Sequence, residues 1–399
     1  MKGQRALIAI VGAGTMGTGI AQVALEAGHE VVIHDVDDGA LARGRARIGE
    51  GLARRAARLD LDADSIDDWV DGRLANLREA VSLDTIAAEA DVVIEAALED
   101  LELKRTIFGV LDRDGSPDAI LATNTSALSI DDIAAGLARP ERVVGMHFFN
   151  PAPVMALVEV VGGGQTAESV LASAAELAIS WGKTAVRSAD APGFIVNRVN
   201  RAFTLEALAA LEGGEANIEA IDAAVRAQGF PMGPFELMDL TGIDVSFAAA
   251  LGIYEGFRRR GDELAARFRP SGTQERLVTE ERLGRKTERG FYVYDGGGAR
   301  RPAEEFTSAG GPAARGGRDA GAAVADRIRL AIDLEAIRAR DDGVATATDI
   351  DVALRLGANH PIGPFEHIDH IGGPAVLLAR VQPLAGRGTR FAPPSSLGG

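Results

Sequence analysis

The sequence predicts a protein of the α/β class, in which a doubly wound and mostly parallel sheet is followed by an all-α C-terminal domain that is duplicated. Over residues 1–187, apolar runs of strand length alternate with amphipathic segments of helix length, a pattern typical of strands joined by crossover helices. From residue 188 the pattern becomes helical, and one helical segment then occurs twice. A chain of 399 residues has room for two or three such domains.

The first elements form a complete dinucleotide-binding pattern. An apolar run at 5–11 leads into the glycine-rich turn GAGTMG at 12–17, and an alanine-rich helical stretch follows up to Gly28. A second apolar run, 31–33, ends at Asp35. The glycine motif alone would be a weak signal. With the strand, the helix and the acidic residue all in place, it predicts a Rossmann-type βαβ unit.

The residues of this unit predict the cofactor. Gly12 permits the tight turn, Gly14 lets the backbone approach a pyrophosphate, and Gly17 lets the helix pack closely on the strand. The helix N-terminus faces the phosphates. Asp35 can hydrogen-bond a ribose diol and would repel a 2′-phosphate, so NAD is expected rather than NADP. The predicted contacts here are Gly12, Gly14, Thr15, Met16, Gly17 and Asp35. No metal site is expected.

The later elements follow in order along the chain. Further strands are predicted at 91–94, 120–123, 142–147, 157–161 and 184–187. Amphipathic helical segments separate most of them, around 38–58, 66–78, 102–112, 130–138 and 168–181. The predicted domains are an NAD-binding domain at 1–187, a first helical copy at 188–295, a flexible linker rich in Gly, Ala, Arg and Pro at 296–321, a second helical copy at 322–382, and a disordered tail at 383–399.

The two helical copies share their framework but differ at one polar position. The segment 232–242 matches 362–372, and the helix with Glu206 matches the helix with Glu335. Asn197 of the first copy is replaced by Asp326 in the second. We therefore expect one working copy and one structural copy. The second copy should cover the first within one chain, or should take the place of a dimer contact in a monomer or homodimer.

Composition excludes several classes of function. The chain has 42 basic and 58 acidic residues, which argues against nucleic-acid binding. It has no cysteine, which excludes disulfides and thiolate catalysis. The first strand leaves no room for a signal peptide, and no apolar run approaches the length of a membrane span. We therefore expect a cytoplasmic enzyme without membrane or nucleic-acid partners.

One histidine stands where a dehydrogenase needs a base. Oxidation of an alcohol requires a group that accepts the hydroxyl proton, and histidine is the usual choice. Of the six histidines, only His147 ends a strand of the cofactor domain, where such sheets place their ligands. Glu159 lies inside the next apolar strand and needs a partner. The pair predicts a general base with its carboxylate, although a purely structural pair remains open.

A polar cluster, 123–126, follows another strand of the cofactor domain. Thr and Ser at the carboxyl end of a parallel strand can hold a cofactor amide or a substrate oxygen. The same residues could equally form a turn and cap the next helix.

These motifs together resemble the NAD-dependent L-3-hydroxyacyl-CoA dehydrogenase family, which includes bacterial 3-hydroxybutyryl-CoA dehydrogenases. The matching segments span about the first 295 residues, and the remainder resembles the second C-terminal module of longer members. The segments are GAGTMGTGIA at 12–21, VVIEAALEDLELK at 92–104, TNTSALSI at 123–130, HFFNPAPVMALVEVV at 147–161, DAPGFIVNR at 190–198, GPFELMDLTG at 233–242 and LGRKTERGFYVYD at 283–295.

The resemblance implies a role for each matching residue. His147 would be the catalytic base, and Glu159 would be its carboxylate. Ser126 and Asn197 would hydrogen-bond the reacting C3 oxygen or the thioester carbonyl. The further implied NAD contacts are Glu99, Lys104, Ser126 and Asn150, and the implied substrate contacts are Ser126, Asn197 and Arg58, the last of these with CoA.

The implied reaction is the reversible oxidation of an (S)-3-hydroxyacyl-CoA to the 3-oxoacyl-CoA, with a short chain such as 3-hydroxybutyryl-CoA and a place in fatty-acid β-oxidation. The sequence departs from the family pattern at Gly51, Ala156 and Glu288, which leaves open how the CoA phosphates are held. Three alternatives also remain open: 3-hydroxyadipyl-CoA as substrate, a non-CoA hydroxyl such as that of carnitine or gulonate, and a non-catalytic NAD-binding structural protein.

Overall fold

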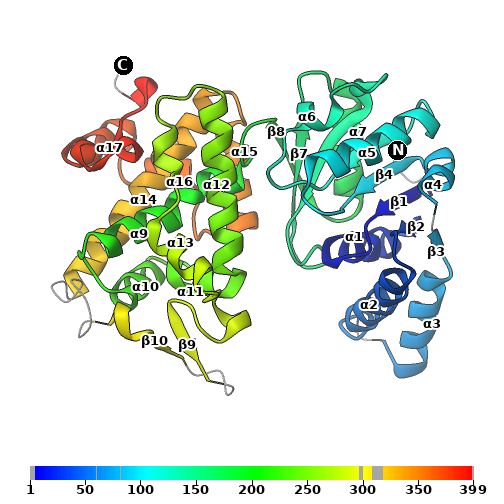
Figure 1. Cartoon of the computed structure of the whole chain (residues 1–399), viewed down its shortest axis with the longest axis horizontal. Coiled ribbons are helices and arrows are strands. Elements are labelled where there is room, and N and C mark those ends of the chain that lie inside the picture. Colours follow the sequence, from blue (N-terminus) through cyan, green and yellow to red (C-terminus); the bar gives the residue numbers. More distant parts are fainter. Residues whose placement is uncertain (1–4, 60, 81, 296–299, 308–317, 398–399) are drawn as a thin grey trace. The chain divides into compact units, whose positions relative to one another are not determined.

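The chain folds into two units, which we describe from a computed structural model (Figure 1). The structure describes residues 5–59, 61–80, 82–295, 300–307 and 318–397. The first unit ends at Phe194, which is later than the predicted boundary at 187/188. The added segment stays with the first unit because the Asp190 carboxylate accepts hydrogen bonds from Ser129 Oγ (2.6 Å) and from the backbone N–H of Asp131 (3.1 Å).

An eight-stranded sheet forms the centre of the first unit, with strand order β3-β2-β1-β4-β5-β6-β7-β8. The strands are β1 (Leu7–Val11), β2 (Glu30–His34), β3 (Leu77–Ala80), β4 (Val92–Glu95), β5 (Ile120–Thr123), β6 (Val143–Phe148), β7 (Leu157–Gly162) and β8 (Thr184–Ala189). All neighbouring pairs are parallel except β6 and β7. The predicted, mostly parallel sheet is confirmed.

Helices cover both faces of this sheet (Figure 1). They are α1 (Thr15–Glu26), α2 (Asp38–Ala56), α3 (Ala63–Leu74), α4 (Leu83–Glu89), α5 (Leu101–Asp114), α6 (Ile130–Ala134) and α7 (Glu168–Ser180), with a 3₁₀ turn at Pro140–Arg142. Successive residues of β1 point to opposite faces. Ile8 and Ile10 join a core with α1, α2 and α7, whereas Ala9 and Val11 join a core with α4, α5 and α6. Burial on both faces explains why the strands are apolar throughout.

β3 and α4 are not predicted by the sequence pattern. The pattern indicates a helical segment up to residue 78, whereas α3 ends at Leu74 and β3 begins at Leu77. β3 lies at the edge of the sheet, and of its four residues only Leu77 is buried. An edge strand with one buried side chain does not produce the apolar run by which the other strands were found.

The second unit is mainly helical. Its helices are α8 (Val196–Val199), α9 (Arg201–Glu212), α10 (Ile218–Ala227), α11 (Pro234–Thr241), α12 (Ile243–Arg259), α13 (Gly272–Thr279), α14 (Arg318–Asp341), α15 (Ala347–Ala358), α16 (Pro364–His370) and α17 (Pro374–Val381). The strands β9 (Tyr292–Tyr294) and β10 (Arg300–Pro302) pair with each other. Within the described residues, no single helix is long and apolar enough to cross a membrane. Of the described helices, only α11 and α12 taken together, with a bend of 101° between them, have the length and composition for it.

The two helical copies pack on each other inside this unit, with α14 against α9 and α10 (Figure 1). Arg198 of the first copy donates from Nε to Glu335 of the second at 2.8 Å. Its counterpart Arg327 donates to Glu206 of the first copy. The arginine of each copy therefore pairs with the equivalent glutamate of the other copy, which is the arrangement of an interface with two-fold symmetry. The second copy covers the first within this chain; that it replaces a dimer contact stays a prediction.

The linker and the tail differ from the prediction where they are described. In the linker, β10 pairs with β9, and the backbone N–H of Ala303 donates to the Phe291 carbonyl at 2.9 Å. α14 already begins at Arg318, and residues 296–299 and 308–317 lie outside the described residues. In the tail, three 3₁₀ turns lie at Gln382–Arg387, Thr389–Phe391 and Ser395–Leu397. Phe391 is buried and Arg390 pairs with Glu206 at 2.6 Å, so packing orders a segment whose composition indicated disorder.

Candidate functional site

The glycine turn between β1 and α1 is shaped by contacts that only glycine allows. At Gly12, φ is +109°, and a Cβ atom would lie 2.6 Å from the Ala96 carbonyl oxygen. At Gly17, a Cβ atom would lie 1.8 Å from the Gly12 carbonyl oxygen. Around Gly14 there is open space where a side chain would be. The turn therefore has the tight bend, the close packing and the free approach that a pyrophosphate requires, so its residues fit NAD.

Asp35 lies against this turn. Its Oδ2 atom accepts a hydrogen bond from the backbone N–H of Ala13 at 2.8 Å, and the side chain is half-buried. A carboxylate held at the end of β2 beside the phosphate turn is placed to bind a ribose diol. Thr15 and Met16 lie in the first turn of α1, where Thr15 is exposed and Met16 is half-buried.

The first testable consequence is the choice of cofactor. We expect kcat/KM with NAD to exceed that with NADP by a large factor, because the Asp35 carboxylate repels a 2′-phosphate. Asp35→Ala should narrow the gap, and Asp38→Ala, on the exposed first turn of α2, serves as the matched control. Equal kcat/KM values for the two cofactors in the unchanged protein would contradict this assignment.

A buried ion cluster lies at the carboxyl ends of β4 and β5. Lys104 Nζ is 2.7 and 2.8 Å from the two carboxylate oxygens of Glu95, and 3.4 Å from Glu99 Oε2. The side chains of Lys104 and Glu95 are only 1% and 0% exposed. Thr123 Oγ1 and the backbone N–H of Ala97 also donate to Glu95, each at 2.7 Å. The Glu95 carboxylate therefore has hydrogen-bond donors from the protein itself, as a buried carboxylate requires.

Glu99 connects this cluster to the predicted polar loop. Its Oε1 atom accepts hydrogen bonds from Thr125 Oγ1 (2.7 Å) and from the backbone N–H groups of Ser126 (2.9 Å) and Ala127 (3.1 Å). Burial alone would raise the pKa of Glu99, but attraction to Lys104 and these hydrogen bonds lower it instead. Lys104 is buried, so it acts through Glu99: it positions the loop that carries Ser126.

Replacing Lys104 tests this interpretation. Lys104→Met would leave two carboxylates facing each other and should reduce the free energy of unfolding by about 3–5 kcal/mol. The depressed pKa of Glu99 contributes stability above its unfolded-state pKa, and this contribution is lost on acidification. The deficit, measured by urea unfolding, should therefore shrink at low pH. Lys286→Met removes the exposed pair with Asp244 and should cost less than about 1 kcal/mol. Equal deficits in the two variants would contradict the assignment.

His147 and Glu159 form the predicted pair. They lie opposite each other on the antiparallel strands β6 and β7, and His147 Nδ1 is 2.6 Å from Glu159 Oε2. His147 is 6% exposed and Glu159 is fully buried. Because a buried carboxylate needs a donor, Nδ1 carries the proton in the neutral ring and Nε2 is the free base.

Phe149 and Phe194 pack on the imidazole. Their ring centroids lie 4.5 and 5.9 Å from that of His147. Phe194 has a φ of +48°, which is rare for an aromatic residue, and such strained residues cluster at functional sites. Neither Phe194 nor Glu95 was among the predicted site residues. Glu95 could have been found, because it ends an apolar strand in the same way that Glu159 interrupts one.

Four of the other histidines have structural partners. His29 Nδ1 accepts from the backbone N–H of Ala6 at 3.2 Å, and His34 Nδ1 lies 2.9 Å from the Ala80 carbonyl. His360 Nε2 lies 2.8 Å from Asn200 Oδ1. His367 Nδ1 is 2.7 Å from Asp333 Oδ2, and this pair belongs to the second helical copy.

The structure brings some of the predicted residues together and leaves others apart. Asn124 Oδ1 accepts from the backbone N–H of Phe148 at 2.9 Å, which joins the loop of Ser126 to the strand of His147. Asn150 is exposed beyond the end of β6. Arg58 is exposed after the end of α2. Asn197 lies half-buried in α8 of the second unit.

The departure at Gly51 has a packing cause. Gly51 is buried, and a Cβ atom there would lie 2.0 Å from Gln22 Oε1. Gln22 in turn donates to Glu26 at 2.7 Å. The position is therefore used for packing of α2 on α1, and a side chain there would require Gln22 to move.

The comparisons with known proteins agree with this geometry. A model of the 3-hydroxyacyl-CoA dehydrogenase NAD binding domain matches residues 7–191. The model of the C-terminal domain matches residues 193–294 and 324–394, which are the two helical copies. The chain belongs to the 3-hydroxyacyl-CoA dehydrogenase family.

Three similar proteins illustrate this membership. A protein of Escherichia coli (strain K12) named 3-hydroxyadipyl-CoA dehydrogenase is 47% identical over 72% of this chain, and the chain spans 58% of that protein's length. A 3-hydroxybutyryl-CoA dehydrogenase of Bradyrhizobium diazoefficiens is 39% identical over 72% of this chain and 95% of that protein. The crystal structure of 3-hydroxybutyryl-CoA dehydrogenase from Escherichia coli K12 has a TM-score of 0.83 at 35% identity, and covers 99% of this chain and 98% of that one.

The predicted family, the enzyme class of NAD-dependent dehydrogenase and the cofactor are thereby confirmed. The roles of individual site residues stay predictions.

Proposed function

We propose that this protein oxidises (S)-3-hydroxyacyl-CoA thioesters reversibly to 3-oxoacyl-CoA, with NAD as hydride acceptor and short chains such as 3-hydroxybutyryl-CoA as substrates. The observation that carries the proposal is the buried His147–Glu159 pair, 2.6 Å apart, at the carboxyl end of β6. A cytoplasmic location and a role in fatty-acid β-oxidation belong to the same proposal.

The pair acts on the hydroxyl proton. His147 Nε2 takes the proton from the C3 hydroxyl while the C3–H bond gives a hydride to the cofactor and the C3–O bond becomes a carbonyl. Glu159 accepts from Nδ1–H, fixes the tautomer and stabilises the imidazolium that forms. In the reverse direction the imidazolium returns the proton to the oxygen. Bound NAD supplies the hydride acceptor for this chemistry.

The remaining site residues bind and orient the substrate. Ser126, held through Glu99, would hydrogen-bond the C3 oxygen or the thioester carbonyl, and Asn197 would contribute a second donor to the same atoms. Asn150 would contact the cofactor. Arg58, exposed after α2, would attract the anionic end of CoA on an otherwise acidic protein.

A panel of substrates tests this function. Purified protein should reduce NAD with 3-hydroxybutyryl-CoA, and kcat/KM should fall when the CoA is removed or replaced by a short thioester. Carnitine and gulonate are the comparison substrates for the non-CoA alternative. Turnover of either of these without CoA, and none of 3-hydroxyacyl-CoA, would overturn the proposal. No turnover of any of them, with NADH still bound, would indicate the non-catalytic alternative.

A further inference from the structure

Arg201, the first residue of α9, is a shielded cation with no acidic partner among the residues that the structure describes. Among the described residues, its polar contacts are two long ones from Nη1 to Ser246, at 3.4 Å to the carbonyl and 3.5 Å to Oγ. Its Nε atom is buried and has no hydrogen-bond partner in the described part of the chain. By contrast, Arg198, Arg267 and Arg327 in the same unit each pair with a carboxylate.

A buried guanidinium group without a counter-charge is expected to bind an anion. Burial lowers the pKa of Arg201 to about 10, and no carboxylate in the described part of the chain offsets that effect. Removing a cation from water without a counter-charge is unfavourable, so such a group is expected where a ligand supplies the charge. The side chain is half-buried rather than fully enclosed, which leaves it accessible to a ligand.

The position of Arg201 indicates which ligand. It follows Asn197 by four residues, and Asn200 between α8 and α9 keeps a helical backbone with φ −72° and ψ −8°. Residues four apart on a helical path lie on one face, about 6 Å apart along the axis. In the second copy the equivalents are Asp326 and Leu330, so the asparagine and the arginine are lost together. Arg201 thus belongs with the working site.

We propose that Arg201 binds the terminal carboxylate of a 3-hydroxydicarboxylyl-CoA, such as 3-hydroxyadipyl-CoA. This inference rests on the proposed function, in which Asn197 binds oxygen atoms at C1 or C3. In an adipyl chain, three carbon–carbon bonds of about 1.5 Å each join C3 to the terminal carboxyl carbon, a span comparable with one helical turn. The phosphates of CoA lie beyond the pantetheine arm, at the other end of the thioester. The span from C3 to the terminal carboxylate therefore allows a bidentate contact between that carboxylate and the Arg201 guanidinium.

The test compares a diacid with a monoacid. We would measure kcat/KM for 3-hydroxyadipyl-CoA and 3-hydroxybutyryl-CoA in the unchanged protein and in Arg201→Leu, which introduces the residue of the second copy. In Arg201→Leu, the kcat/KM for 3-hydroxyadipyl-CoA relative to that for 3-hydroxybutyryl-CoA should fall about 10–100-fold, because a charge-assisted contact contributes that much. Most of the change should be a higher KM for 3-hydroxyadipyl-CoA. Arg201→Lys should retain part of the ratio. Arg58→Leu is the matched control, because loss of a CoA contact should change both substrates alike and leave the ratio unchanged.

Each outcome decides a different point. An unchanged ratio in Arg201→Leu, or an equal loss with both substrates, would assign Arg201 to a phosphate or to packing and would overturn this inference alone. If the unchanged protein oxidises neither thioester, the proposed function fails as well. If Arg201→Leu does not fold, as judged by circular dichroism, Arg201→Gln and Arg201→Lys give the same comparison with polar side chains.

Discussion

Replacing His147 by glutamine should lower kcat by about 10²–10⁴-fold while NADH binding persists, because the general base is lost and the cofactor turn is untouched. The glutamine amide can still donate to Glu159, which keeps the buried carboxylate satisfied. Steady-state rates give the loss, and NADH fluorescence titration and circular dichroism confirm binding and folding. Turnover within a few-fold of the unchanged protein would show that the His147–Glu159 pair is structural.

The chain provides a matched control for this variant. His367 faces Asp333 at 2.7 Å, much as His147 faces Glu159, but it lies in the second helical copy. His367→Gln should change stability and leave turnover of folded protein nearly unaffected. Glu159→Gln should also reduce kcat. Because His147 and Glu159 act as a unit, the double variant should lose less than the product of the single losses.

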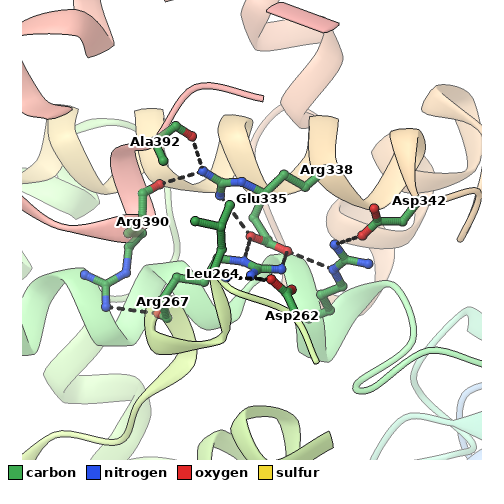
Figure 2. Close-up of polar contacts among 9 residues, drawn as sticks. Asp262, Leu264, Arg267, Glu335, Arg338, Asp342, Arg390 and Ala392 are labelled. Atoms are coloured by element: carbon green, nitrogen blue, oxygen red, sulfur yellow. Dashed lines mark hydrogen bonds and ion pairs between the residues drawn. The ribbon is translucent and has the colours of Figure 1, made fainter. Parts of the chain in front are cut away.

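Neutralising Glu335 should cause a large loss of stability. Figure 2 shows Glu335 between Arg267 and Arg338, and Arg198 Nε also donates to it at 2.8 Å. All four side chains are at least nine-tenths buried. Glu335→Gln would leave three guanidinium groups together without their carboxylate, at a cost of about 3–5 kcal/mol in the free energy of unfolding. Urea unfolding measures this loss. Asp342→Asn is the control, because Asp342 contacts the same Arg198 but is 53% exposed.

The same cluster predicts the pH dependence of stability. Burial alone would raise the pKa of Glu335, but Arg198, Arg267 and Arg338 lower it to about 2. The folded-state pKa is thus below the unfolded-state value, so the carboxylate stabilises the fold fully above the unfolded value of 4.5. This stabilisation, about 3 kcal/mol, is lost as the pH falls from 4.5 toward 2. In Glu335→Gln this part of the pH dependence should be absent; an unchanged acid profile would contradict the assignment.

Removing the second copy extends this prediction. Truncation after Asp295 would leave Arg198 and Glu206 without their partners Glu335 and Arg327. We expect a truncated protein that aggregates or forms a new dimer, because its exposed face has the charges of a two-fold interface. The intact protein should bind one NADH per chain, since Asp326 replaces the asparagine of the working copy. A monomeric, fully active truncated form, or two NADH sites per chain, would contradict this account.

The cofactor turn and the His147–Glu159 pair could be predicted from the sequence because their signals are local. Gly12, Gly17 and Asp35 are fixed by the backbone conformations and the short spacing that a βαβ unit demands. Glu159 stands out as a charge inside an apolar strand, and adjacent strands in one sheet bring it opposite His147. In each case burial or backbone geometry restricts one position to very few residue types.

Only the tertiary structure decided contacts between distant segments of ordinary composition. The ion pairs Arg198–Glu335 and Arg327–Glu206 join residues more than a hundred positions apart. In the sequence, each of these residues is an ordinary charged residue of a helix. The composition of the tail around Phe391 predicts disorder, yet the tail is held by burial of the Phe391 ring and by ion pairs of Arg387 and Arg390. The sequence by itself determined the class of fold, the cofactor and the pairing of His147 with Glu159, because these depend on local patterns. Packing of the two helical copies decided the ion pairs between them and the order of the tail, because the energy of a buried charge depends on which partners the fold brings to it.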